Sequence, residues 1–290
     1  QEKLLAGTGL DPENDPVVFT TDYGLEIKFA KGLTNSYLTG YTYFTMGKYR
    51  NNDVNWVIIG YDPSVERFVG DFSGDLYQNA GPVQGGFSQT STIDNTPAGN
   101  AIASEMYAIS SEAKSNKEIG DGCVLCLSEC SFLTSVFGTN NNYEGSTLQQ
   151  NIQKLYDEEL NLSASDKARI APQKLCTPYV NSQYAVSQNQ FLFPMAGGTA
   201  STTTLDKLNS EGAKFFGMED YLTTNNKRIS YYIGSSTPTT YFARSGSVTY
   251  TNEAYVYLTD GVPYCKVYSY GSNYYVTNAY NMRPAFVLKL

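Results

Sequence analysis

The chain has 290 residues, enough to bury a core without metals or disulfides, either as one large domain or as two small ones. Only 17% of the residues are charged, and the 25 tyrosines and 14 phenylalanines favour β structure, because aromatic side chains fit a pleated, half-buried surface. The net charge of −8 argues against a nucleic-acid partner, and the lack of a long apolar run argues against a membrane span.

Residues 1–40 are predicted to form a polar N-terminal extension or joint that contains one pair of strands. The strands are expected at 17–21 and 25–29, on either side of the turn-forming sequence Asp22-Tyr23-Gly24. The first six residues have neither the charged nor the apolar region of a signal peptide. Either the chain is not exported or a signal has already been removed.

Residues 41–290 are predicted to form one α+β domain, because helical patterns lie in the middle of the chain and strand patterns at both ends. Strands are expected at 55–60, which holds the only tryptophan, and at 67–72, 122–129, 191–194, 231–233, 240–244, 254–258, 265–270, 274–277 and 283–290. Helices are expected at 101–117, 146–160, 164–170 and 203–216, with Ser163 capping the third. Residues 73–100 are predicted to be a polar insertion.

The chain contains no histidine, which removes the common Ser-His-Asp and Cys-His mechanisms and every zinc site that needs imidazole. Cys123 and Cys126 have the spacing of metal ligands, with Cys130 four residues further on. However, this segment is apolar and predicted to be a strand, on which Cys123 and Cys126 would point to opposite faces. We therefore predict buried cysteines, no metal site and no cofactor.

The remaining chemical feature is a tyrosine-rich stretch near the C-terminus, interleaved with Asn, Ser, Thr and Gly. Antibody paratopes use the same mixture, since tyrosine offers a rigid amphipathic surface and the small polar residues supply adaptable hydrogen bonds. The alternative is that many of these tyrosines are ordinary sheet residues, with one face in the core. The candidate ligand-binding residues are Tyr250, Tyr255, Tyr257, Tyr264, Tyr268, Tyr270, Asn273, Tyr274, Tyr275 and Tyr280.

Seven segments, taken in order, resemble a bacterial domain family of unknown function with a C-type lectin-like fold, which the sulfatase-modifying, formylglycine-generating enzymes share. They span about residues 40–290, namely 47–59, 124–129, 146–170, 190–194, 208–216, 241–245 and the closing Met282-Arg283-Pro284-Ala285-Phe286-Val287-Leu288. The resemblance implies that both ends of the domain join one sheet, with long irregular loops around it. It implies no activity.

Chemistry known in this fold does not transfer readily to the chain. Formylglycine-generating enzymes use a pair of cysteines near the C-terminus, whereas only Cys265 lies there in this sequence. The carboxylate triplets of calcium-dependent lectins are also missing. The stretch from Tyr250 to Tyr280 is similar to the contact region of retroelement-diversified receptor-binding proteins, where Tyr, Asn and Ser accumulate before a closing strand that contains Arg.

These features favour a non-enzymatic recognition module, outside the cell or at a cell surface or virion, that binds a protein or a carbohydrate through the tyrosine-rich stretch. One alternative is a structural module of a larger surface protein or virion. Another is an oxidase of the formylglycine-generating type, with Cys265 as the reactive thiol. The oligomeric state stays open.

Overall fold

The structure is a computed structural model that describes residues 15, 17–20, 24–30, 38, 41–62, 123–179, 183–195, 230–247, 250–259, 265–268 and 275–289. Across these ranges the chain is mostly β-sheet, with two α-helices and one π-helical turn. The strand predicted at 67–72, the insertion at 73–100 and the helices predicted at 101–117 and 203–216 lie outside the described residues.

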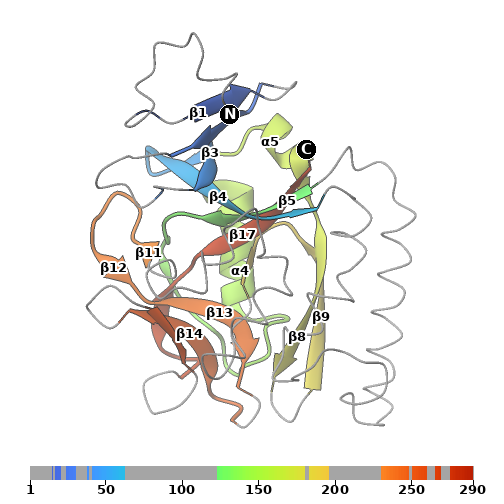
Figure 1. Cartoon of the computed structure of the whole chain (residues 1–290). Coiled ribbons are helices and arrows are strands. Elements are labelled where there is room, and N and C mark those ends of the chain that lie inside the picture. Colours follow the sequence, from blue (N-terminus) through green and yellow to red (C-terminus); the bar gives the residue numbers. More distant parts are fainter. Residues whose placement is uncertain are drawn as a thin grey trace.

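The larger sheet has eight strands and joins the two ends of the chain (Figure 1). Its pairings are all antiparallel. The last strand pairs with β5, β10 and β7, and β2 pairs with β3, so the described part of 1–40 extends the sheet of 41–290. In spatial order the strands are β1 (Val17–Thr20), β2 (Glu26–Phe29), β3 (Thr42–Tyr49), β4 (Asn52–Asp62), β5 (Cys123–Ser128), β17 (Pro284–Lys289) and β10 (Phe193–Pro194), with β7 (Ile170–Ala171) also on β17.

The smaller sheet has five strands and is built mainly from the C-terminal part of the chain. In spatial order these are β15 (Cys265–Tyr268), β14 (Ala254–Thr259), β13 (Tyr241–Gly246), β16 (Ala279–Asn281) and β6 (Thr134–Val136). Of the strand predicted at 274–277, Tyr274 lies outside the described residues, Tyr275 forms an isolated β-bridge, and residues 276–277 form a turn that leads into β16. Two separate hairpins complete the described strands: β8 (Gln173–Tyr179) with β9 (Gln183–Gln190), and β11 (Ser230–Tyr231) with β12 (Pro238–Thr239).

The helical segments follow the predicted pattern closely. The helix expected at 146–160 begins as α4 (Thr147–Lys154), capped by Ser146, and continues as the π-helical turn η2 (Leu155–Glu159). The helix α5 (Ala164–Arg169) has a full capping box between Ser163 and Asp166, which satisfies two backbone N–H groups at its start. Among the described residues, no helix is long and apolar enough to cross a membrane.

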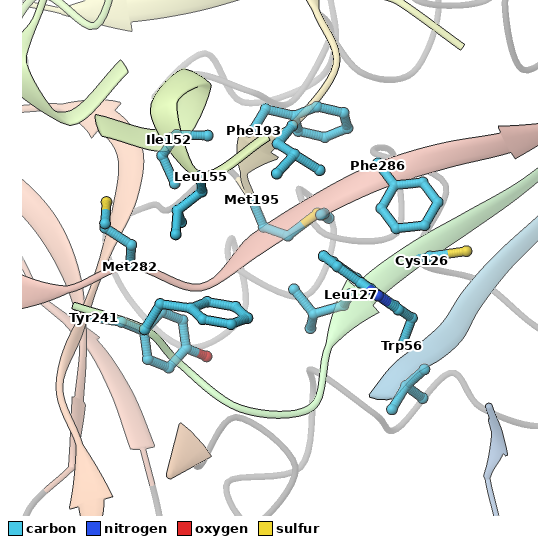
Figure 2. Close-up of a cluster of buried hydrophobic side chains, with 14 of the residues drawn as sticks. Trp56, Cys126, Leu127, Ile152, Leu155, Phe193, Met195, Tyr241, Met282 and Phe286 are labelled. Atoms are coloured by element: carbon cyan, nitrogen blue, oxygen red, sulfur yellow. The ribbon is translucent and has the colours of Figure 1, made fainter. Parts of the chain in front are cut away.

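The core surrounds the central parts of β4, β5 and β17, where residues 56–58, 126–128 and 284–288 are buried in succession and therefore on both faces. Figure 2 shows Ile152 and Leu155 from the helical segment in one cluster with Trp56 and Phe286. The rings of Trp56 and Phe286 meet edge to face with centroids 4.6 Å apart, and the indole Nε1 donates to the carbonyl of Met46 at 2.8 Å. The ring of the only tryptophan is therefore packed inside the core, and its N–H group has a hydrogen-bond acceptor there.

Gly47 fixes the contact between β3 and the end of η2. It has a positive φ of 77°, and a Cβ placed on it would lie 2.6 Å from the carbonyl oxygen of Leu160. The next residue, Lys48, donates its backbone N–H to that same oxygen at 2.7 Å. A side chain at Gly47 would separate the two segments and break this hydrogen bond.

Gly47→Ala is therefore expected to lower the free energy of unfolding by about 2 kcal/mol or more, in the range of overpacked core substitutions. Gly145→Ala is the matched control, because Gly145 has a similar φ of 76° but nothing within 4 Å of a Cβ. Its cost should be that of the backbone conformation alone, about 1 kcal/mol. Urea unfolding of both variants measures the difference, and equal losses would contradict the steric account.

Candidate recognition surface

Tyr250 lies in the loop between β13 and β14. It is the most exposed aromatic residue in the described part of the chain. Its side chain is 45% exposed, and no other large hydrophobic side chain among the described residues is classed as exposed. The loop is closed at its base, where the N–H of Ser247 donates to the carbonyl of Glu253 at 2.9 Å. The Ser247 hydroxyl also accepts from the N–H of Tyr250 at 3.3 Å. Ser247 and residues 250–253 are called the Tyr250 loop below.

Asn141 anchors the Tyr250 loop through hydrogen bonds. Its side chain is almost wholly buried, and its Nδ2 donates to the carbonyls of Ser247 and Tyr250, the latter at 2.8 Å. Its backbone N–H donates to the carbonyl of Thr251 at 3.0 Å. A Cβ on Gly246 would collide with the Asn141 carbonyl oxygen, so glycine is required where the two segments meet. One asparagine thus fixes the backbone on both sides of the exposed tyrosine.

A third segment lies beside these two. The N–H of Val276 donates to the carbonyl of Asn252 at 2.9 Å, and Tyr275 forms an isolated β-bridge with Glu253. The carbonyl of Val276 in turn accepts from the N–H groups of Phe137 and Gly138. The segments 137–144, the Tyr250 loop and 275–281 are therefore joined by backbone hydrogen bonds. They are called the platform below.

The predicted binding tyrosines have different positions in the structure. Tyr250 is exposed, while Tyr275 and Tyr280 are half-buried; the Tyr280 ring packs edge to face on Phe242 with centroids 5.1 Å apart. Tyr255 and Tyr257 are 2% and 1% exposed, so their side chains belong to the core and not to a contact surface. Of Tyr268 the structure describes only the backbone, in β15, and Tyr264, Tyr270, Asn273 and Tyr274 lie outside the described residues.

In a half-exposed strand, buried and exposed side chains alternate. This alternation is absent around Tyr255 and Tyr257, because β14 is covered on both faces. Val256, between them, is also fully buried, and the ring of Tyr257 stacks on Tyr241 of the neighbouring strand with centroids 4.8 Å apart. For these two residues the prediction of a binding role is corrected to a packing role. The other alternative drawn from the sequence, ordinary sheet tyrosines, describes them better.

The platform carries no positive charge on its described residues. Its charged side chains are Glu144, which accepts from Gln149 at 2.9 Å on the helix side, and Glu253. Glu253 is only 8% exposed, and its Oε2 has no hydrogen-bond partner among the described residues. Burial raises the pKa of this carboxyl above its ordinary value.

The described cysteines lack the features of a reactive or metal-binding site. Neither Cys126 nor Cys130 is part of a disulfide. Burial raises the pKa of Cys130 to about 12, with the carboxylate of Glu129 adding to the effect. Within the described ranges no three His, Cys, Asp or Glu side chains gather as a metal site would require. The side chains of Cys123 and Cys265 are not among those described.

Sequence reasoning did not single out Asn141, although it recognised the asparagine-rich loop at 138–142. The three consecutive residues Asn140, Asn141 and Asn142 are alike in sequence, yet only Asn141 is buried. Its neighbours instead make local turns: the Asn140 oxygen accepts from the N–H of Asn142, and the Asn142 oxygen accepts from the N–H of Glu144. A buried asparagine inside such a loop is a signal that only the tertiary structure reveals.

Asn141→Ala is expected to lower the free energy of unfolding by about 2 kcal/mol, because two buried carbonyls lose their donor. It should also speed hydrogen exchange at the amides of residues 247–252 more than elsewhere. Asn140→Ala is the matched control: it removes one exposed turn contact and should change little. Uniform exchange throughout the sheet in Asn141→Ala would contradict a local anchoring role.

Glu253→Gln is expected to stabilise the protein above the raised pKa of Glu253, because an amide has no charge to bury. In the native chain the folded state keeps the Glu253 proton to a higher pH than the unfolded state does. Stability contributed by the neutral acid is therefore lost as the pH rises through the folded-state pKa. Unfolding measured from pH 4 to pH 8 should show this decline in the native protein and less of it in Glu253→Gln. Identical pH profiles would contradict the prediction.

Known proteins offer no independent guide to this surface. Comparison of the chain with protein-family models, with curated proteins and with solved structures finds no match to any of the three. The function is therefore inferred from the contacts, burial and charge of the platform.

Proposed function

We propose that the protein is a non-enzymatic recognition module, outside the cell or at a cell surface, and that the platform around Tyr250 is its contact surface. The observation that carries this proposal is that Tyr250, the one large hydrophobic residue exposed among the described residues, lies on a loop whose backbone is fixed by hydrogen bonds to Asn141. Tyr275 and Tyr280 flank it on the neighbouring segment. Tyr264, Tyr268, Tyr270, Asn273 and Tyr274 stay candidate contact residues from the sequence alone, whereas Tyr255 and Tyr257 belong to the core.

A fixed loop favours binding because little conformational freedom is lost when the partner arrives. The Tyr250 loop is held at Ser247, Tyr250 and Thr251 by one buried side chain and its backbone. Tyrosine adds a rigid ring with only two rotatable side-chain bonds, which keeps the entropy cost of contact low. The ring is also accessible to a partner, because Tyr250 is 45% exposed.

The C-type lectin-like fold remains part of this proposal. Two features support it: the last strand lies in the sheet of the N-terminal strands, and Arg283 precedes that strand. In retroelement-diversified proteins of similar fold, contact residues lie shortly before the closing strand. The Tyr250 loop and the 275–281 segment have that position in this chain.

An oxidase role has less support. Such chemistry needs a thiolate, and a thiol becomes one at neutral pH only where its surroundings lower its pKa. The pKa of Cys130 is shifted the opposite way. Cys265, the cysteine expected to react, sits in β15, and thiol titration of the native chain against Cys265→Ser addresses it directly.

The recognition role is tested by probing a protein array and a glycan array with the full chain, with Tyr250→Ala and with Tyr232→Ala. Tyr232 is a half-buried tyrosine whose hydroxyl accepts from Arg50, away from the platform, and serves as the matched control. We expect Tyr250→Ala to retain the native melting temperature and to weaken binding about tenfold or more, as loss of an aromatic hot spot does. Tyr232→Ala should bind normally. Absence of any Tyr250-dependent signal on both arrays would refute the proposal.

A further inference from the structure

The described residues of the platform form a neutral to acidic surface that is rich in amides and hydroxyls. Segments 137–144, 250–253 and 275–281 contain no lysine or arginine. Their two carboxylates are Glu253, which is buried, and Glu144, which accepts a hydrogen bond from Gln149. A ligand that carries sulfate, phosphate or carboxylate groups would meet no counter-charge there.

The exposed polar groups of the platform are suited to hydroxyl partners. Asn140 and Asn142 each use their side-chain oxygen to accept a backbone N–H at 3.0 Å, which fixes the amide plane and leaves Nδ2 as the group available to a ligand. Thr251, Asn252 and Thr277 are exposed on the adjoining segments. Together they supply uncharged donors and acceptors around the one exposed ring.

A protein partner would require a different surface. Stable protein interfaces have a desolvated apolar centre within roughly 800 Å² on each side, built from several aromatic or aliphatic anchors. Here Tyr250 is the only large hydrophobic side chain among the described residues that is classed as exposed. On the described part of the platform, one exposed ring amid amides and hydroxyls matches a ligand with one apolar face and many hydroxyls.

Building on the recognition role proposed above, we infer that the ligand of the platform is an uncharged saccharide, with one sugar ring stacked on Tyr250 and its hydroxyls bonded to the neighbouring amides. The tyrosine ring stacks on the apolar C–H face of the sugar, and the phenolic hydroxyl stays in water. Since the saccharide carries no charge, the affinity is insensitive to ionic strength.

The inference is tested with immobilised neutral oligosaccharides of hexoses and N-acetylhexosamines, beside their sialylated and sulfated forms. The full chain is expected to bind neutral forms, to be displaced by the free neutral sugar, and to keep its affinity when the salt concentration is raised. Tyr250→Ala should weaken binding about tenfold, while Tyr250→Phe, which keeps the ring, should remain close to the native affinity. Melting temperatures of both variants establish that each is folded.

Each other outcome overturns the saccharide assignment. These are binding to sialylated or sulfated forms alone, neutral-sugar binding that survives Tyr250→Ala in a folded variant, and no binding to any saccharide. Tyr250-dependent binding to protein spots alone would also overturn it, yet would leave the recognition role standing. Loss of Tyr250 dependence on both arrays ends both proposals.

Discussion

The two sheets are held together by the buried guanidinium of Arg283. This side chain is 1% exposed; its Nε donates to the carbonyl of Ser128 at the end of β5, and its Nη1 donates to the hydroxyl of Tyr241 on β13. The guanidinium also lies 5.3 Å from the centre of the Tyr241 ring. A buried cation is costly unless its donors are used, so the packing of both sheets must place these acceptors correctly. The geometry at Arg283 therefore constrains the whole smaller sheet.

Strand β13 connects Tyr241, the hydrogen-bond partner of Arg283, with the platform. A second fully buried arginine, Arg244, donates from Nε to the Thr177 hydroxyl at 3.2 Å and from Nη1 to the carbonyl of Pro194 at 3.1 Å. These bonds tie β13 to the β8–β9 hairpin and to β10. Two residues further along, β13 ends at Gly246, which packs closely against Asn141. A rigid strand thus leads directly into the loop that presents Tyr250, as binding loops on rigid scaffolds do.

The sequence could predict elements whose signals are local. Ser163 and Asp166 gave the start of α5, and the apolar runs gave β4, β5 and β17. The β8–β9 hairpin escaped prediction because its strands are polar and Pro178 interrupts one of them. The candidate surface was only partly predictable, since Tyr250 and Tyr257 both lie in the tyrosine-rich stretch from Tyr250 to Tyr280. Which of them is exposed depends on strands brought together from distant parts of the chain.

The position of Trp56 makes the chain convenient for spectroscopy. It is the only tryptophan, lies fully inside the core of the larger sheet, and donates its indole N–H to Met46. Tyr250 is in the loop that connects two strands of the other sheet. Indole emission thus reports whether the core is intact, and an event confined to the loop leaves it unchanged. Loss of structure can therefore be followed in an unlabelled sample without interference from occupation of the surface.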